Sequence, residues 1–259
     1  MRFDEVFLSV VLGAIMLLSI GSQSAVTASP LPGEEINAFL TEFDFSGGSG
    51  ENFALYQVRW GDHRSFERIV MEFKGKDTDT QQHGLPRMEV EKEEYPARVT
   101  IRLPGVPTRM KEIYTVRHPF SKSRMLSGLD LFDSCGSGQL LALIPSRPLE
   151  YRIFTLWNPA RLVIDFRPTT TVPPDRVRYF LRTFPLFGDQ VCAFKKAALK
   201  DGIIGRLLTD ASGNTFGEAG VFDQPENAFA AKKRLGKLDE QFSLVIKARG
   251  IMKTPEVLP

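Results

Sequence analysis

Hydrophobic and polar residues alternate along much of the chain between Phe53 and Arg167, and this alternation predicts half-buried β-strands. In the stretch from Arg98 to Leu103, for example, every second residue is aliphatic. The strands predicted in this way cover Ala54 to Trp60, Phe66 to Lys74, Arg98 to Leu103, Met125 to Phe132, Leu140 to Ile144, Tyr151 to Leu156 and Arg161 to Phe166. Strands at this spacing, with little helical periodicity between them, predict an all-β sandwich.

The pattern changes after Thr169 to Asp175, where two prolines and a run of threonines predict a linker between domains. From Arg176 to Arg249 the predicted order is strand, helix, strand, strand, helix, strand, which is a βαββαβ, ferredoxin-like α/β domain. The predicted strands are Val177 to Thr183, Ile204 to Thr209, Thr215 to Val221 and Phe242 to Ala248, and the predicted helices are Asp189 to Lys200 and Pro225 to Leu238. Asp223 precedes the second helix and is its expected N-cap.

The two ends of the chain carry different signals. Val6 to Ile20 is an apolar run of 15 residues, which is shorter than the ~20 residues of a spanning helix and predicts a signal peptide over residues 1–28. The alternative is an uncleaved membrane anchor. Residues 29–52 are predicted to be a leader segment, 53–168 the sandwich, 169–175 the linker, 176–249 the α/β domain, and 250–259 a disordered tail.

Composition adds few constraints on function. The chain is 42% hydrophobic and 25% charged with a net charge of +2, which is ordinary for globular domains and does not indicate a polyanionic partner. Its two cysteines, Cys135 and Cys192, lie in different predicted domains. Export would permit a disulfide between them, but sequence does not reveal pairing, and Cys192 is expected to be a small buried residue on a helix.

Two segments of the predicted sandwich resemble a known family. Val58 to Val70, VRWGDHRSFERIV, and Phe154 to Asp165, FTLWNPARLVID, look like the opening and closing strands of an AMIN domain. AMIN domains are β-sandwich modules that localise envelope proteins by binding peptidoglycan. The resemblance spans about 115 residues and implies the same fold and role for residues 53–168.

A third segment resembles a second family. Thr215 to Leu235, TFGEAGVFDQPENAFAAKKRL, has a strand ending G-x-F followed by an Asn-Ala-x-Ala helix, which is similar to the second half of a SPOR (sporulation-related repeat) domain. That resemblance implies recognition of peptidoglycan glycan strands, in particular strands stripped of stem peptides. Together the two resemblances imply an exported, periplasmic protein of the bacterial cell envelope, linked to cell division or wall remodelling.

The candidate glycan-binding residues are Phe180, Arg182, Phe216 and Glu218, which share the face of the predicted sheet that points away from the helices. Aromatic rings stack on sugars, and arginine and glutamate bind hydroxyl and amide groups. The alternative is the opposite side-chain parity, with both phenylalanines in the core.

Other chemistry finds little support in the sequence. The three histidines, His63, His83 and His118, do not form a zinc-binding pattern, and Ser134 to Gly138 lacks the partners of a cysteine nucleophile. Phosphate-binding loops are absent, and an RNA-binding module of the same element order would need a basic aromatic strand that Thr215 to Phe222 lacks.

We therefore expect a non-catalytic peptidoglycan-binding protein without cofactor or metal. Its expected partners are glycan strands and a cell-wall hydrolase or divisome protein. Nucleic acid is not an expected partner, and a membrane is one only if the N-terminal segment stays uncleaved. The alternative is a protein-interaction module that recruits an envelope enzyme or secretion complex.

Overall fold

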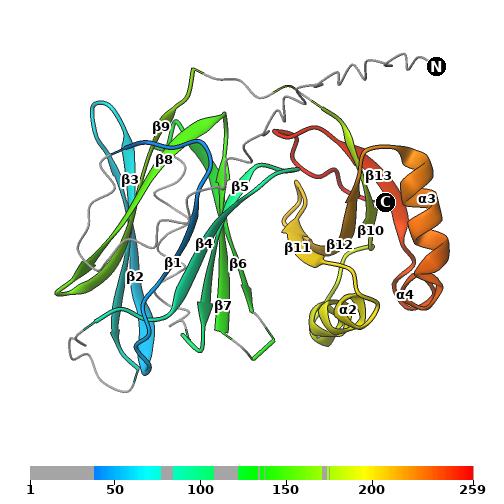
Figure 1. Ribbon diagram of the computed structural model, residues 1–259, viewed down its shortest axis with the longest axis horizontal. Coiled ribbons are helices and arrows are strands. Elements are labelled where there is room, and N and C mark those ends of the chain that lie inside the picture. Colours follow the sequence, from blue (N-terminus) through cyan, green and yellow to red (C-terminus); the bar gives the residue numbers. More distant parts are fainter. Residues whose placement is uncertain are drawn as a thin grey trace, which may run out of the picture.

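A computed structural model describes residues 38–76, 84–107, 122–133, 135–136, 138–170, 174 and 176–258 of the protein. Two packed antiparallel β-sheets are followed by a βαββαβ domain, which confirms the predicted fold class (Figure 1). The predicted signal peptide, His83, His118 and most of the linker lie outside the described residues.

The β-sandwich consists of a four-stranded and a five-stranded sheet. The four-stranded sheet has the order β2-β3-β9-β8 and the five-stranded sheet has the order β1-β4-β5-β7-β6. Their bounds are β1 Asp44–Gly47, β2 Phe53–Asp62, β3 Glu67–Gly75, β4 Met88–Glu93, β5 Arg98–Pro104, β6 Leu126–Asp133, β7 Gly138–Pro145, β8 Leu149–Trp157 and β9 Ala160–Pro168.

Alternation along the strands places one set of side chains between the sheets. On β3, for example, Ile69, Met71 and Phe73 are fully buried and form part of the sandwich core. Strands β8 and β9 form a hairpin, with Trp157 paired to Ala160 at its turn. Each inward aliphatic or aromatic side chain of this kind stabilises the fold by about 1.5–3 kcal/mol relative to exposure.

Two strands of the sandwich have no counterpart among the predicted strands. β4 pairs with β5, and β1 lies inside the predicted leader and pairs with β4, with Phe45 opposite Val90. Phe45 and Val90 are both buried in the sandwich core. The five-stranded sheet therefore includes a strand that precedes residue 53.

The α/β domain contains a sheet of order β11-β12-β10-β13 with its helices on one face. Its elements are β10 Arg178–Arg182, α2 Asp189–Lys200, β11 Gly205–Thr209, β12 Thr215–Phe222, α3 Pro225–Arg234, α4 Gly236–Phe242 and β13 Val245–Arg249. Gly217 permits close packing here, because a Cβ at this position would lie 2.4 Å from the Phe194 ring.

The second half of this domain corrects two predictions. The helix expected over Pro225 to Leu238 is divided into α3 and α4, which are separated at Leu235. Asp223 is not the N-cap of α3: Gln224 occupies that position, without a side-chain cap. The Asp223 carboxylate instead forms an ion pair with Arg178 at 2.7 Å, so it links the start of the helix to β10.

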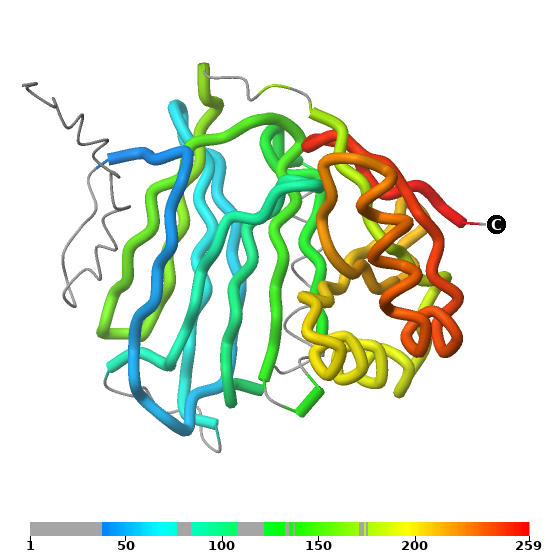
Figure 2. Tube along the Cα trace, turned by 45° about the vertical axis from the view of Figure 1, so that its right-hand side comes forward, coloured from blue at the N-terminus to red at the C-terminus, as the bar shows by residue number. Residues whose placement is uncertain are grey.

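The α/β domain packs on the outer face of the five-stranded sheet, so the molecule has three layers of sheet (Figure 2). Phe132 and Leu140 from the sandwich join the core that contains Phe194. A disulfide between Cys135 and Cys192 connects the same two surfaces. The expectation that Cys192 is an unpaired core residue was therefore wrong, because the docking of α2 against the sandwich brings the two cysteines together.

Residues 251–258, which we call the strap, follow β13 and pack back on the protein. Their expected disorder is not what the structure shows. Ala97 in the sandwich donates its backbone N–H to the Ile251 carbonyl at 2.7 Å. Ala211 in the α/β domain donates to the Pro255 carbonyl at 3.2 Å, and Leu258 is buried. The strap thus contacts both domains.

Candidate binding surfaces

The four predicted glycan-binding residues lie together on one face of the α/β sheet. Leu181 and Ala219 are neighbours across β10 and β12 and belong to the core under the helices. Side chains alternate along a strand, so Phe180, Arg182, Phe216 and Glu218 point the opposite way. The parity assumed for these residues agrees with the structure. We call the surface that they form the covered face.

The covered face is not open, in contrast to the expectation. Each of the four residues has at most 1% of its surface exposed. The reason is tertiary: the sandwich covers one part of the face and the strap covers the other. Sequence periodicity identifies which side chains share a face, but it does not reveal what packs against that face.

The sandwich part of the cover is the turn between β4 and β5. The Tyr95 ring packs beside Phe180, with ring centroids 6.3 Å apart. Arg206 and Arg249 both donate to the Tyr95 carbonyl. Arg249 also holds both carboxylate oxygens of buried Glu218, at 2.7 and 2.8 Å. Glu218 also accepts a hydrogen bond from Arg206 at 3.0 Å, so it holds both interface arginines in place.

A second buried arginine crosses the domain interface from the other side. Arg98 on β5 donates Nη1 to the Leu207 carbonyl of β11 at 2.6 Å and binds Glu93 with Nε and Nη2. Burial by itself raises the pKa of Glu93, but attraction and hydrogen bonding from Arg98 outweigh it, and the pKa lies below its usual value. The Glu93 carboxylate is therefore charged at neutral pH.

The strap covers the part of the face around Arg182. Arg182 donates Nη1 to the Glu256 carbonyl, and its guanidinium lies over the Phe216 ring, with Cζ 3.6 Å from the centroid. The Glu256 carboxylate pairs with Lys247 on β13 at 2.7 Å. Lys247 is opposite Phe180 in the register, so it also belongs to the covered face.

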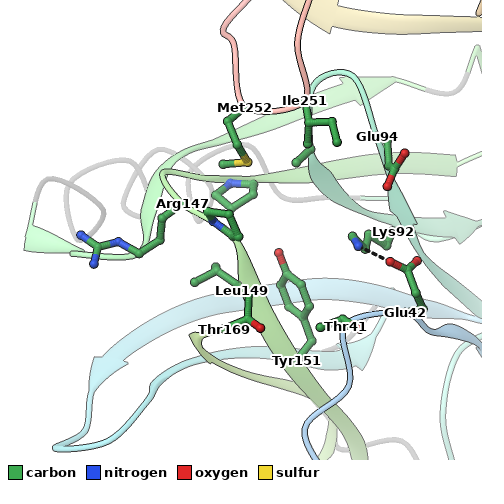
Figure 3. Close-up of a pocket in the computed structure, with 13 residues that line it drawn as sticks. Thr41, Glu42, Lys92, Glu94, Arg147, Leu149, Tyr151, Thr169, Ile251 and Met252 are labelled. Carbon is green, nitrogen blue, oxygen red and sulfur yellow. Dashed lines mark hydrogen bonds and ion pairs between the residues drawn. The ribbon is translucent and has the colours of Figure 1, made fainter. Parts of the chain in front are cut away.

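The first residues of the strap close a small cavity of about 130 Å³ against the sandwich (Figure 3). Ile251 and Met252 lie on one side of it, and Leu149 and Tyr151 lie on the other. The sticks in Figure 3 come from the sandwich, the segment before β1 and the strap. The start of the strap is therefore anchored to the sandwich, whereas its later residues lie over the α/β sheet.

A different surface lies on the outer side of the four-stranded sheet, away from the α/β domain (Figure 1). Arg68, Asp165 and Arg152 are neighbours across β3, β9 and β8. Arg68 binds the Asp165 carboxylate with Nε and Nη2 at 2.5 and 2.9 Å, and Arg152 binds it with the same two atoms. Asp165 is fully buried beneath the two guanidinium groups.

Phenylalanine rings surround this ion row. The Arg68 guanidinium lies 5.3 Å from the centroid of Phe66 and 5.4 Å from that of Phe154. Arg152 lies 5.3 Å from the Phe39 ring. The rings are partly exposed, and their contacts to the arginines are in the range of cation–π attraction. We call this surface the arginine–aromatic face.

A second ion row runs across the same side of the sheet. Glu72 on β3 accepts hydrogen bonds from Arg59 on β2 and Arg161 on β9, at 3.2 and 3.3 Å. Val70, between the two rows, is half-buried. The outer side of the sheet therefore carries a regular array of charged and aromatic groups.

The candidate site residues inferred from sequence did not include this face, although signals for it were present. Phe66, Arg68, Arg161 and Asp165 all belong to the two segments that resemble an AMIN domain. Charges recur at Arg68 and Glu72 with the parity opposite to the aliphatic core positions. That pattern marks an outward charged stripe, but the pairing of β3 with β9 is needed to join the charges into rows.

Electrostatics keep the central carboxylate of the face ionised. Burial by itself raises the pKa of Asp165, but hydrogen bonds and attraction from Arg68 and Arg152 outweigh it and hold the pKa below its usual value. The row Arg68–Asp165–Arg152 thus carries a net positive charge at neutral pH. Both arginines keep partly exposed edges, with 30% and 24% of their side-chain surface accessible.

The fold defines a class: a β-sandwich linked by a disulfide to a βαββαβ domain. Such disulfides are typical of oxidising compartments outside the cytoplasm. Within the described residues, no helix is long and apolar enough to cross a membrane, and no three His, Cys, Asp or Glu side chains are grouped to hold a metal ion. In comparisons with known proteins, no family model matches the chain and no curated protein emerges as a relative.

Proposed function

We propose that the protein is a non-catalytic binder of peptidoglycan glycan strands in the bacterial cell envelope, where it takes part in cell division or wall remodelling. The resemblances to AMIN and SPOR domains supply the ligand class. The fold and the disulfide are compatible with that assignment and with a periplasmic location. A cell-wall hydrolase or divisome protein is the expected protein partner.

The observation that carries the proposal is the arginine–aromatic face. A glycan strand offers apolar ring faces edged by hydroxyl and acetamido groups, and it needs a surface that combines flat apolar groups with hydrogen-bond donors. Phe66 and Phe154 provide the flat groups, and the edges of Arg68 and Arg152 provide donors. Shared binding of Asp165 holds both guanidinium groups in fixed orientations.

The test is binding of the full chain to purified peptidoglycan sacculi, with and without amidase treatment, for the wild type and Phe154→Ala. Loss of one stacking ring costs about 1 kcal/mol or slightly more, which corresponds to a fivefold to tenfold weaker affinity, roughly. The control is Phe229→Ala on α3, which removes a ring that is 63% exposed on the α/β domain.

Circular dichroism and a melting curve establish that both variants fold. The proposal predicts weaker binding for Phe154→Ala and unchanged binding for Phe229→Ala. Equal binding by all three proteins would show that the arginine–aromatic face does not bind the glycan. A wild-type protein that binds neither preparation would contradict glycan recognition altogether.

A second candidate function rests on exposed apolar residues beside the domain interface. Leu199, Ile204 and Val221 are 79%, 85% and 51% exposed, and Ile204 is hydrogen-bonded to the residue before Val221. Such a cluster suits a protein partner, such as an envelope enzyme or secretion complex. A fluorescent fusion separates the two functions: glycan recognition predicts septal enrichment that Phe154→Ala weakens, whereas recruitment predicts loss with Ile204→Ser.

A further inference from the structure

The buried guanidinium of Arg182 is incompletely satisfied. Its side chain is 1% exposed, and among the described residues its Nε and Nη2 atoms have no hydrogen-bond partner. Asp210 approaches Nη2, but at 3.6 Å. Burial lowers the pKa of Arg182, although Glu218 and Asp210 oppose that effect. An arginine in this state has unused hydrogen-bond donors, and buried donors without a partner are unfavourable.

The element that buries Arg182 is the later part of the strap. Glu256 presents its carbonyl to Arg182 and its carboxylate to Lys247. Pro255 adds one backbone contact to Ala211. Leu258 is also buried, so this part of the strap is held by Glu256, one backbone contact and one apolar side chain. The first part of the strap is held differently, because Ile251 packs with Tyr95, Ala97 and Phe180.

We propose that residues 254–258 are a displaceable cover over a carboxylate-binding site formed by Arg182, Lys247 and Phe216. Glu256 supplies a carbonyl and a carboxylate oxygen where a ligand would supply its own carboxylate. Displacement of the cover frees all the donors of Arg182 for a bidentate contact, which a single carbonyl does not make. Lys247 adds a second positive charge, and the buried ring of Phe216, which lies against the Arg182 guanidinium, adds an apolar surface.

This inference deepens the proposed function and rests on it. Amidase cleavage between the glycan and its stem peptide leaves a free lactyl carboxylate on each muramic acid residue. Strands that keep their peptides carry an amide at that position, which lacks the charge. An arginine site would therefore distinguish stripped strands from substituted ones. The cover would make this second contact available only after it is displaced.

The experiment measures binding of full-length protein and of a chain ending at Lys253, which keeps Ile251 and Met252 in place. The probes are glycan fragments from amidase-treated peptidoglycan, chitotetraose, which has the same sugar backbone without carboxylates, and lactate, which has the carboxylate without sugar. We expect the truncation to raise affinity for the stripped glycan by about tenfold, the effect of one charge-assisted contact. Arg182→Gln in the truncated chain should remove that gain, and chitotetraose should show none.

A point variant tests the same cover in case the truncated chain does not fold. Glu256→Lys keeps the whole strap but sets like charges beside Lys247 and Arg182, so it should raise affinity in the same direction. Its control is Glu240→Lys at an exposed position of α4, which changes the net charge equally at another place. Near-ultraviolet circular dichroism checks the fold of each protein.

The outcomes distinguish failure of the proposed cover from failure of the proposed function. If the full chain binds stripped glycan but neither truncation nor Glu256→Lys raises the affinity, the cover is refuted and the proposed function stands. Equal gains with chitotetraose, or a gain that survives Arg182→Gln, would refute the carboxylate site. If lactate alone binds as well as the glycan, the site binds anions without recognising the sugar, and the glycan site is refuted. If no variant binds glycan, the proposed function itself fails.

Discussion

Replacement of Asp165 by asparagine tests the central ion row of the arginine–aromatic face. The wild-type carboxylate is fully buried and accepts hydrogen bonds from Arg68 and Arg152 on both sides. The amide keeps the shape, but its NH₂ group meets arginine donors and its charge is lost. Removing one partner of a buried ion pair typically costs about 3–5 kcal/mol.

The exposure of the two arginines reduces that figure. About a quarter to a third of each side chain is accessible, 24% for Arg152 and 30% for Arg68, so water partly replaces the lost carboxylate. We therefore expect Asp165→Asn to lower the free energy of unfolding by about 3 kcal/mol, the low end of the range. For a chain of this size, that is a fall in melting temperature of roughly 6–12 °C.

The contribution of Asp165 to stability depends on pH. The folded-state pKa of Asp165 lies below its usual value, so its contribution is fully present above the ordinary pKa of about 3.9 and is lost as pH falls through the lowered pKa. Wild type and Asp165→Asn should therefore differ in urea unfolding at pH 7 and converge in acid.

The matched control is Asp62→Asn, which removes a carboxylate from an exposed pair with Arg124. Such pairs contribute about 0–1 kcal/mol. Two results would refute the assignment of Asp165 as a buried, ionised centre. One is a difference between wild type and Asp165→Asn that is as small as the control's, and the other is a difference that does not shrink as the pH falls below the ordinary pKa of about 3.9.

Other predictions follow from the domain interface and the α/β core. Reduction, or Cys135→Ser with Cys192→Ser, should lower the free energy of unfolding by about 4 kcal/mol, as expected from chain entropy for cysteines 57 residues apart; an unchanged urea midpoint would contradict this. Gly217→Ala should cost about 1–3 kcal/mol through overpacking against Phe194, whereas Gly128→Ala, with open space around its Cβ, should be neutral. Thermal unfolding of the two alanine variants checks the contrast, and equal melting temperatures would show that the α/β core accommodates the added methyl group.

Much of the fold was accessible from sequence because alternation is a local signal. The parity of β3 follows from Ile69, Met71 and Phe73 alone, and the parity of β10 follows from Leu181. Helix α2 was predicted with the bounds that it has in the structure. Strands β1 and β4 were missed because one is only four residues long and the other is mostly charged, so both receive their order from pairing with β5 and with each other.

The state of the candidate site depended on contacts that no local pattern records. Phe180 and Arg182 were placed on the correct face, but their burial results from Tyr95 and Glu256, which are distant in sequence. The strap lies near the C-terminus, where disorder is common, yet it is ordered by docking against both domains. The disulfide partner of Cys192 likewise depends on how two domains meet.

For the arginine–aromatic face, the sequence reveals the residues but not their arrangement. The charges of Arg68 and Asp165 are evident in the sequence, and both residues belong to the segments that resemble an AMIN domain. The row itself exists only after three strands are put in register. Long-range strand pairing therefore converts scattered outward charges into one surface.

The most direct measurement of the proposed function is co-sedimentation of the full chain with purified peptidoglycan sacculi, before and after amidase treatment. We predict that the protein pellets with the sacculi and that Phe154→Ala, but not Phe229→Ala, leaves most of the protein in the supernatant at limiting sacculus concentration. Wild-type protein that remains in the supernatant with both preparations would contradict the account.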